Sequence, residues 1–203
     1  MQDNQLSLSQ TRFRHLRAEE IENPFTYINE LCEHETELYY LNRDILDLVK
    51  TAYSYREEFF DGIHKSYAYN QIQVIKVVEI LFVLHCSKLD LKPGNVRSYA
   101  NNYRYLNREE MNDIRVFLGD FFGFRSLSEW HEFIDDLLIY AYKEGDEGLF
   151  NDVDKPFKMM AYFEKLAEAF FLVYEIMKLK KSYPKASAHP VADGVAPDLD
   201  AAK

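Results

Sequence analysis

Two long stretches of the chain, residues 67–87 and 156–178, would carry apolar side chains on nearly every face if they were helical. A narrow polar stripe, which includes Gln71, Lys76 and Glu79, interrupts the first of them. A helix that is apolar on all sides is a buried helix, because it has no face to offer to water. We therefore expect these two stretches to form a pair of central helices in an all-α protein.

Shorter helices are predicted before each of these stretches. Asn23 followed by Pro24, and separately Asp113, are residue types typical of helix N-termini, so a helix is expected to begin at each point. Ser126 and Glu129 have the spacing of a capping box. The helix that begins there carries apolar residues at helical spacing until the sequence EGDEG, which ends it.

The first line of the pattern occurs twice, as RFRHLRAEEIEN at residues 12–23 and as NYRYLNREEMND at residues 102–113. The similarity continues in two further pairs of segments, which are 43–53 with 132–142 at a separation of 89, and 59–88 with 149–178 at a separation of 90. Self-similarity at a nearly fixed spacing is typical of repeated units, so we interpret it as an internal duplication of roughly 75 residues per copy. A chance likeness between two amphipathic helical regions is the alternative.

The resulting fold prediction is an all-α helical bundle built from two pseudo-repeated three-helix units around two central buried helices. Pro93 and Gly94 break the chain between the units, and a further short helix is expected after them. The predicted organisation is a flexible N-terminus (1–11), helical repeat 1 (12–88), a connecting segment (89–105), helical repeat 2 (106–181) and a disordered tail (182–203).

Charge and composition exclude several classes of protein. The 203 residues include 24 Lys and Arg against 34 Asp and Glu, a net charge of −10, and such an acidic body repels phosphate backbones and anionic membranes. The polar N-terminal sequence has no signal-peptide pattern, and two cysteines fit a reducing compartment, so we expect a cytoplasmic protein. Cys32 and Cys86 are expected to be small core residues.

Motifs for common catalytic chemistries are missing from the sequence. There is no Gly-rich phosphate loop, no Gly-x-Ser-x-Gly, no His-Glu-x-x-His and no Cys-x-x-Cys. The segment ELCEHETE places Glu30, His34 and Glu37 on one helical face, a combination that can bind a transition metal, but an exposed acidic helix end has the same sequence. We therefore predict no metal and no cofactor.

One short segment resembles a known family of enzymes. RSLSEWH, residues 125–131, resembles the Arg-x(4–6)-His motif of HEPN domains, which are all-helical bundles. Many family members are metal-independent ribonucleases that use this arginine and histidine at a dimer interface. The resemblance implies Arg125 and His131 as catalytic residues of an RNA-cleaving enzyme.

The repeated aromatic–arginine line suggests a different function. Arginine and tyrosine are enriched at the energetic centres of protein interfaces. We predict a non-catalytic helical module for protein binding or scaffolding, whose partner is an unknown protein or a second copy of the chain, with the ribonuclease as the alternative. The candidate binding residues are Arg12, Arg14, Tyr103, Arg104 and Tyr105. In an alternative interpretation, the same residues clamp each copy's first helix to the acidic body of the protein.

Overall fold

The computed structural model describes residues 12–32, 35–53, 67–87, 89–92, 103–142 and 156–182, and all regular structure in these ranges is helical. Its helices are α1 (Ala18–Glu22), α2 (Phe25–Cys32), α3 (Glu35–Tyr53), α4 (Tyr67–Cys86), α5 (Arg108–Asn112), α6 (Ile114–Phe124), α7 (Leu127–Tyr142) and α8 (Pro156–Ser182). The prediction of an all-α bundle is confirmed.

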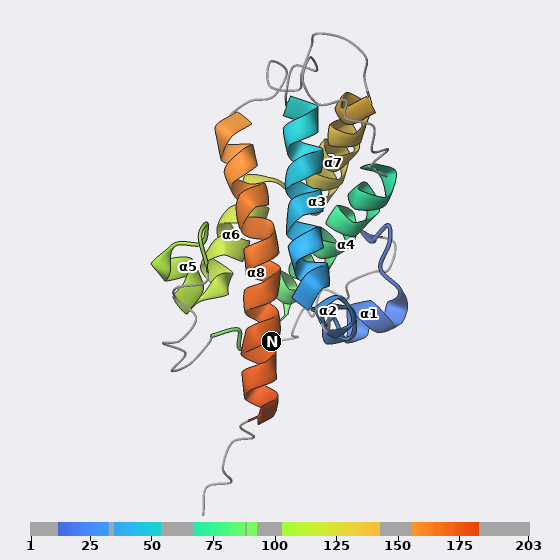
Figure 1. Cartoon of the computed structure of the whole chain (residues 1–203). Helices are drawn as coiled ribbons and strands as arrows, with labels where there is room; N and C mark the ends of the chain where they lie inside the picture. The colour runs from blue at the N-terminus through green and yellow to red at the C-terminus, as the bar shows by residue number, and fades with distance from the viewer. Residues whose placement is uncertain are drawn as a thin grey trace, which may run out of the picture.

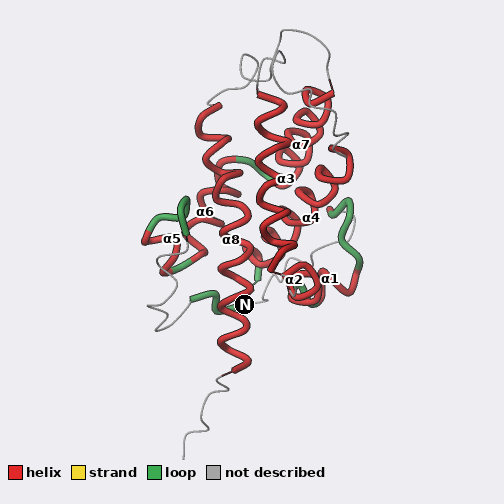
Figure 2. Tube along the Cα trace, in the orientation of Figure 1, coloured by secondary structure: helices red, strands yellow, loops and turns green. Residues whose placement is uncertain are grey.

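The four longest helices, α3, α4, α7 and α8, form the body of the bundle (Figure 1). The short pair α1 and α2 lies near one end of the bundle, and the pair α5 and α6 lies on the other side of α8 (Figure 1). Connections of one or two residues join α1 to α2, α5 to α6 and α6 to α7. Figure 2 shows the described loops in green among the helices. Along the chain, the short pair α1 and α2 thus precedes the long helices α3 and α4, and the short pair α5 and α6 precedes α7 and α8.

The contacts between the long helices differ from those expected of a central pair formed by α4 and α8. The most extensive contact joins α3 to α7, and the next ones join α4 to α7 and α3 to α8, whereas α4 and α8 meet only over a short length. The two predicted central helices are therefore not packed against each other along their length. Both helices are deeply buried, as Leu81 and Phe170 show with 0% exposure, but each lies mainly against α3 or α7. A uniformly apolar sequence predicts burial and does not specify the neighbour.

Local sequence signals at the helix starts agree well with the structure. The Asp113 side chain accepts a hydrogen bond from the Arg115 N–H and caps α6. The Ser126 N–H and hydroxyl both donate to Glu129 Oε2 (2.7 Å each), which confirms the capping box at α7. Helix α2 begins at Phe25, directly after Pro24. The one-turn helices α1 and α5 within the repeated line are not predicted by the sequence.

The two cysteines have different environments. Cys32 is buried, as expected, but Cys86 is exposed at the last position of α4, so the prediction of a core residue is wrong there. The terminal segments 1–11 and 183–203 and the short helix expected after Gly94 lie outside the described residues.

Helix α4 is long and apolar enough to cross a membrane by length and composition, and 56% of its apolar window is buried inside the protein. The core helix of a globular bundle has the same properties, so this finding does not assign a membrane location.

Candidate functional site

A buried glutamate binds the start of the described chain. The backbone N–H of Arg14 donates to Glu79 Oε1 (2.5 Å), and the N–H groups of His15 (3.2 Å) and Leu16 (3.1 Å) donate to Glu79 Oε2. Glu79 is on α4 and is 0% exposed. Hydrogen bonds to a charged group contribute about 1.5–3 kcal/mol each, so these three bonds compensate for much of the cost of burying the carboxylate. We call this arrangement the first clamp.

A second glutamate makes the same set of bonds on α8. The backbone N–H of Arg104 donates to Glu168 Oε1 (2.7 Å), and the N–H groups of Tyr105 (2.9 Å) and Leu106 (2.8 Å) donate to Glu168 Oε2. Glu168 is half-buried, whereas Glu79 is fully buried. We call this arrangement the second clamp.

Each clamp is extended by a second carboxylate and a lysine. In the first, Glu20 accepts hydrogen bonds from the Arg17 N–H (2.6 Å) and from Lys76 Nζ (3.2 Å). Burial alone would raise the pKa of Glu20, but the hydrogen bonds from Arg17 and Lys76 outweigh burial and hold the pKa below its ordinary value of 4.5. The carboxylate thus stays ionised while it caps α1 and binds α4.

The corresponding carboxylate of the second clamp is Glu110. It accepts hydrogen bonds from the Asn107 N–H (2.8 Å) and from Lys165 Nζ (2.7 Å). Asn107 also caps α5 through its own side chain, which accepts from the Glu109 and Glu110 N–H groups. Both clamps therefore combine one carboxylate at the N-terminus of a one-turn helix with a Lys-x-x-Glu pair on a long apolar helix.

Residues with the same role in the two long helices are 89 positions apart. Lys76 and Lys165 have this separation, and so do Glu79 and Glu168. The aromatic contacts agree, because the rings of Phe13 and Phe82 and those of Tyr103 and Phe171 are each 6.3 Å apart. The separation of 90 inferred from sequence for these helices is therefore wrong by one residue. Sparse identities fix a helical pattern but allow a slip of one position.

His131 faces the first clamp from α7. Its Nε2 lies 3.1 Å from Glu79 Oε1, although the two groups lack hydrogen-bond alignment. The histidine is 4% exposed, so it is enclosed with Glu79 inside the protein. Asn42 stands 89 positions earlier, on α3, and its buried Oδ1 has no hydrogen-bond partner among the described residues.

Arg125 has different neighbours from His131. Arg125 follows α6, and its guanidinium carbon lies 5.3 Å from the ring centroid of Phe133 and 5.9 Å from that of Phe124. No hydrogen bond or ion pair joins Arg125 to His131 within the described residues. The two residues of the HEPN-like motif are thus engaged separately, Arg125 by aromatic rings and His131 by Glu79.

The predicted binding residues fall into two groups. Arg12 and Arg104 have exposed side chains, and the Arg104 guanidinium lies 5.6 Å from the ring of Tyr105. Arg14 instead forms an ion pair with Asp135 of α7 (2.6 Å), and Tyr103 is half-buried against Phe171. Arg14 and Tyr103 thus make intramolecular contacts, although the Arg14 side chain is itself 39% exposed.

Lys76, Glu79, Lys165 and Glu168 were not singled out as a site by the sequence prediction. The available signal was a charged pair with three-residue spacing inside each of two otherwise apolar helices. Such charges are rarely buried without partners. The partners turn out to be backbone N–H groups, which have no signature in the sequence.

Metal ligation has no support among the described residues, where no cluster of three His, Cys, Asp or Glu side chains could hold an ion. Of the acidic segment considered above, Glu30 is exposed, and His34 and the side chain of Glu37 lie outside the described residues.

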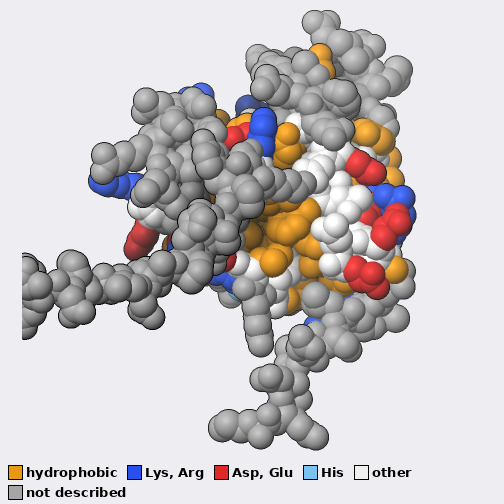
Figure 3. Space-filling view, turned by 90° about the horizontal axis from the view of Figure 1, so that it is seen from below, with side chains coloured by type: hydrophobic (Ala, Val, Ile, Leu, Met, Phe, Trp, Pro, Cys, Tyr) orange, Lys and Arg blue, Asp and Glu red, His pale blue; other side chains and the backbone are white. Residues whose placement is uncertain are grey.

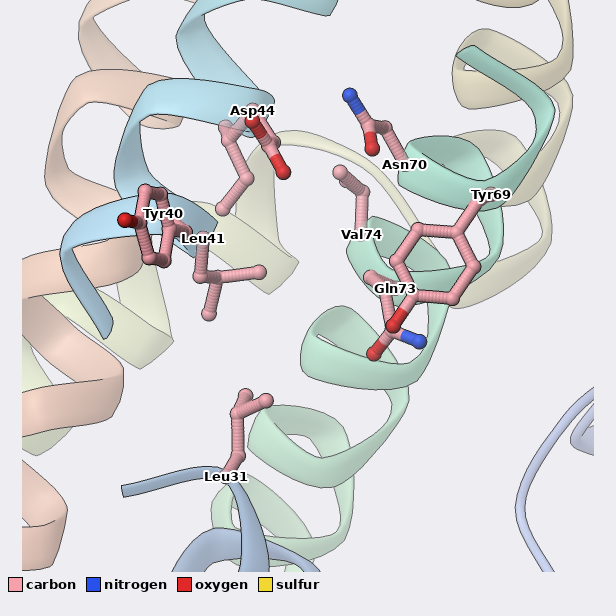
Figure 4. Close-up of a pocket in the computed structure, with 9 residues that line it drawn as sticks. Leu31, Tyr40, Leu41, Asp44, Tyr69, Asn70, Gln73 and Val74 are labelled. Atoms are coloured by element: carbon pink, nitrogen blue, oxygen red, sulfur yellow. The ribbon is translucent and has the colours of Figure 1, made fainter. Parts of the chain in front are cut away.

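A pocket of about 230 Å³ opens between α2, α3 and α4. Figure 4 shows Leu31 at one end of it and Asp44 and Asn70 at the other. Tyr40 and Tyr69 are the exposed lining residues, with 47% and 58% exposure. The pocket thus combines an apolar interior with a small number of polar groups.

Comparison with known proteins gave no match to any protein family, curated protein or solved structure.

Proposed function

We propose that the protein is a non-catalytic helical module for protein binding or scaffolding, built from two copies of one helical unit and acting in the cytoplasm. Its partner is another protein or a second copy of the chain, and neither nucleic acid nor a membrane is expected to bind its acidic body. The presence of two clamps with the same bonds in the same order supports descent from one unit.

One observation carries the binding proposal. The second clamp holds the chain through backbone N–H groups, so the side chain of Arg104 is not needed for it and lies exposed beside Tyr105. Exposed arginine next to an aromatic ring is a combination found at interface hot spots. Arg12 is likewise exposed at the start of the first clamp.

Exposed apolar groups provide further support. Ile139, Tyr142 and Phe157 are each more than half exposed. Figure 3 shows a different face, seen from below the view of Figure 1, on which hydrophobic side chains gather near the middle and acidic side chains lie at one edge. Large apolar groups at the surface are typical of interaction sites when they form a contiguous patch.

The test is the double variant Arg104→Ala with Tyr105→Ala. Both changes keep the backbone N–H groups that donate to Glu168, so the free energy of unfolding should change by no more than the roughly 0.5 kcal/mol typical of surface changes. The melting temperature should therefore move by about 2 °C at most. Recovery of partners in a pull-down from the native host should fall at least tenfold, since loss of hot-spot side chains costs about 2 kcal/mol or more.

A matched variant separates binding from folding. Leu48→Ala removes a fully buried side chain of α3 and leaves the second clamp, Arg104 and Tyr105 unchanged, so it should lower the melting temperature while the folded fraction still recovers partners. Unchanged partner recovery by the double alanine variant would contradict the proposed binding residues.

The ribonuclease remains an alternative prediction. No observation favours it, because His131 is 4% exposed and is directed at Glu79, and because Arg125 rests on aromatic rings. RNA cleavage that is lost on His131→Ala in a folded variant would revive it.

A further inference from the structure

The second unit contains an aromatic cluster between α6, α7 and α8. The indole ring of Trp130 stacks on Phe121, with centroids 4.1 Å apart and planes at 5°. Tyr162 and Phe163 contact the indole edge-on, at 5.8 and 5.9 Å. The indole Nε1–H donates to the backbone carbonyl of Phe121 (3.1 Å), so a fully buried tryptophan has both its ring and its polar group satisfied.

Smaller or more polar residues occupy the corresponding positions of the first unit. With the separation of 89 that the clamps give for α4 and α8, Gln73 corresponds to Tyr162 and Val74 to Phe163. The sequence similarity of 43–53 with 132–142 has the same separation, and extended to the start of α3 it pairs Leu41 with Trp130. Leu31, at the separation of 90 that holds for the segments before α3, corresponds to Phe121. All four of these first-unit residues line the pocket between α2, α3 and α4. The pocket is therefore located where the second unit holds its tryptophan.

We propose that this pocket receives a tryptophan side chain from a protein partner. The inference rests on the proposed protein-binding function and names the group that the partner inserts. In the bound state, the partner's indole would take the place in the first unit that the indole of Trp130 takes in the second.

The size of the pocket fits a single side chain. Its volume of about 230 Å³ is below the roughly 300–1,000 Å³ typical of pockets for drug-sized ligands. Tyr40 and Tyr69 stand exposed at its rim, and Ile72, one turn after Tyr69, is 38% exposed. A partner that inserts one aromatic side chain would therefore cover apolar surface around the opening as well.

Polar groups of the pocket suit an aromatic ring with an N–H donor. Leu31 lies in the last turn of α2, where backbone carbonyls lack intrahelical donors. Asn70 is 6% exposed, and its side-chain amide lines the pocket. The Asp44 carboxylate and the Asn70 amide lie at the same end of the pocket (Figure 4). Asp44 Oδ1 already accepts hydrogen bonds from Arg43 Nε (3.0 Å) and Nη2 (2.8 Å). An indole N–H can donate to the other carboxylate oxygen or to the Asn70 amide oxygen, whereas phenylalanine has no N–H to offer.

The first experiment titrates the full chain with N-acetyl-tryptophanamide and follows the backbone amide resonances by NMR. Saturable shifts should appear at residues 40–45 and 69–74 and should be absent from α6. N-acetyl-leucinamide, as an aliphatic control, should bind at least tenfold more weakly.

Filling the pocket provides the decisive variant. Leu41→Trp places an indole ring of the protein itself in the pocket, as Trp130 does in the second unit. The pocket is then filled, so this variant should not bind the probe. Val116→Trp adds the same ring at an exposed position of α6 and should bind the probe as the wild type does. If Leu41→Trp fails to fold, Val74→Phe, which copies Phe163, serves the same purpose with a smaller change.

Three outcomes would overturn the inference. The first is the absence of saturable shifts in the wild type, and the second is unchanged probe binding by a folded pocket-filled variant. The third is binding of free indole without binding of N-acetyl-tryptophanamide, because the pocket would then take a small molecule. Each of these results leaves the proposed function intact if Arg104→Ala with Tyr105→Ala still loses the partner. Unchanged partner recovery by that double variant counts against the proposed function even when the probe binds.

Discussion

At the scale of single residues, Glu79 and Glu168 connect distant parts of the chain. Each carboxylate accepts three backbone N–H groups from a segment more than 60 residues away in sequence. A buried carboxylate is strongly destabilising unless hydrogen-bond donors surround it. The clamps therefore fix the path of the segment before α1 and of the segment before α5.

Replacing Glu79 by glutamine should reveal this role. Glutamine keeps the shape but presents an NH₂ group to one or two of the backbone donors, so Glu79→Gln should cost about 2–4 kcal/mol. The melting temperature should fall by roughly 5–15 °C, given about 2–4 °C per kcal/mol for a chain of this size. Glu168→Gln should cost less because Glu168 is half-buried. The exposed Glu132→Gln is the control, and equal melting temperatures for all three variants would contradict the clamp.

The pKa of Glu20 predicts how stability depends on pH. Because the hydrogen bonds from Arg17 and Lys76 lower this pKa despite burial, the folded state binds the proton more weakly than the unfolded state. The stability that Glu20 contributes is present above its ordinary pKa of 4.5 and is lost as pH falls through the lowered value. Glu20→Gln should reduce the loss of stability between about pH 5 and pH 3.

Urea unfolding at pH 7, 5, 4 and 3 measures this dependence. The exposed Glu109→Gln should follow the wild-type curve. If Glu20→Gln also follows the wild-type curve, Glu20 does not titrate with folding.

At the scale of helices, the sequence predicted where helices begin and which helices are buried, but it did not predict which helices pack against each other. Capping residues such as Asp113 and Ser126 act locally, so their effect can be read from a few adjacent positions. The contact of α3 with α7 depends on the shapes of both surfaces at once, and no local pattern encodes it. The one-turn helices were missed for a related reason, since α1 and α5 are fixed by Glu79 and Glu168 of remote helices. The pocket was missed as well, because it reflects side chains that are smaller than their counterparts in the other unit.

Charge substitutions along α4 and α8 test the corrected register. Leu81 and Phe170 are 0% exposed and 89 positions apart, so aspartate at either should unfold the protein. An unpaired charge in the core costs several kcal/mol, against a total stability of roughly 5–15 kcal/mol. Phe171→Asp should be tolerated better because Phe171 is half-buried. Far-UV circular dichroism and soluble yield distinguish the three, and a folded Phe170→Asp variant with an unfolded Phe171→Asp variant would restore the separation of 90.

At the scale of the whole molecule, contacts cross between the two halves of the chain. Helix α4 packs on α6 and α7, and α8 packs on α2 and α3. The apolar surface of each long helix is thus covered partly by the other half. This arrangement favours one shared core over two independent domains, although both halves repeat the same clamp.

Cutting the chain between the halves tests the shared core. Fragments 1–101 and 102–203 would each expose the apolar surfaces that the other half covers, and a small domain is marginal even with its own core complete. Each fragment alone should therefore lack a cooperative thermal transition, and an equimolar mixture should regain helicity and a single transition.

Residues 16–88 contain 7 basic and 13 acidic residues, and residues 106–178 contain 8 basic and 16 acidic residues, so the halves repel each other. Because salt screens this repulsion and leaves apolar burial in place, recombination should be tighter at 0.5 M than at 0.05 M sodium chloride. A cooperative transition in either isolated fragment would show that the clamped unit folds by itself and that the two halves are separate domains.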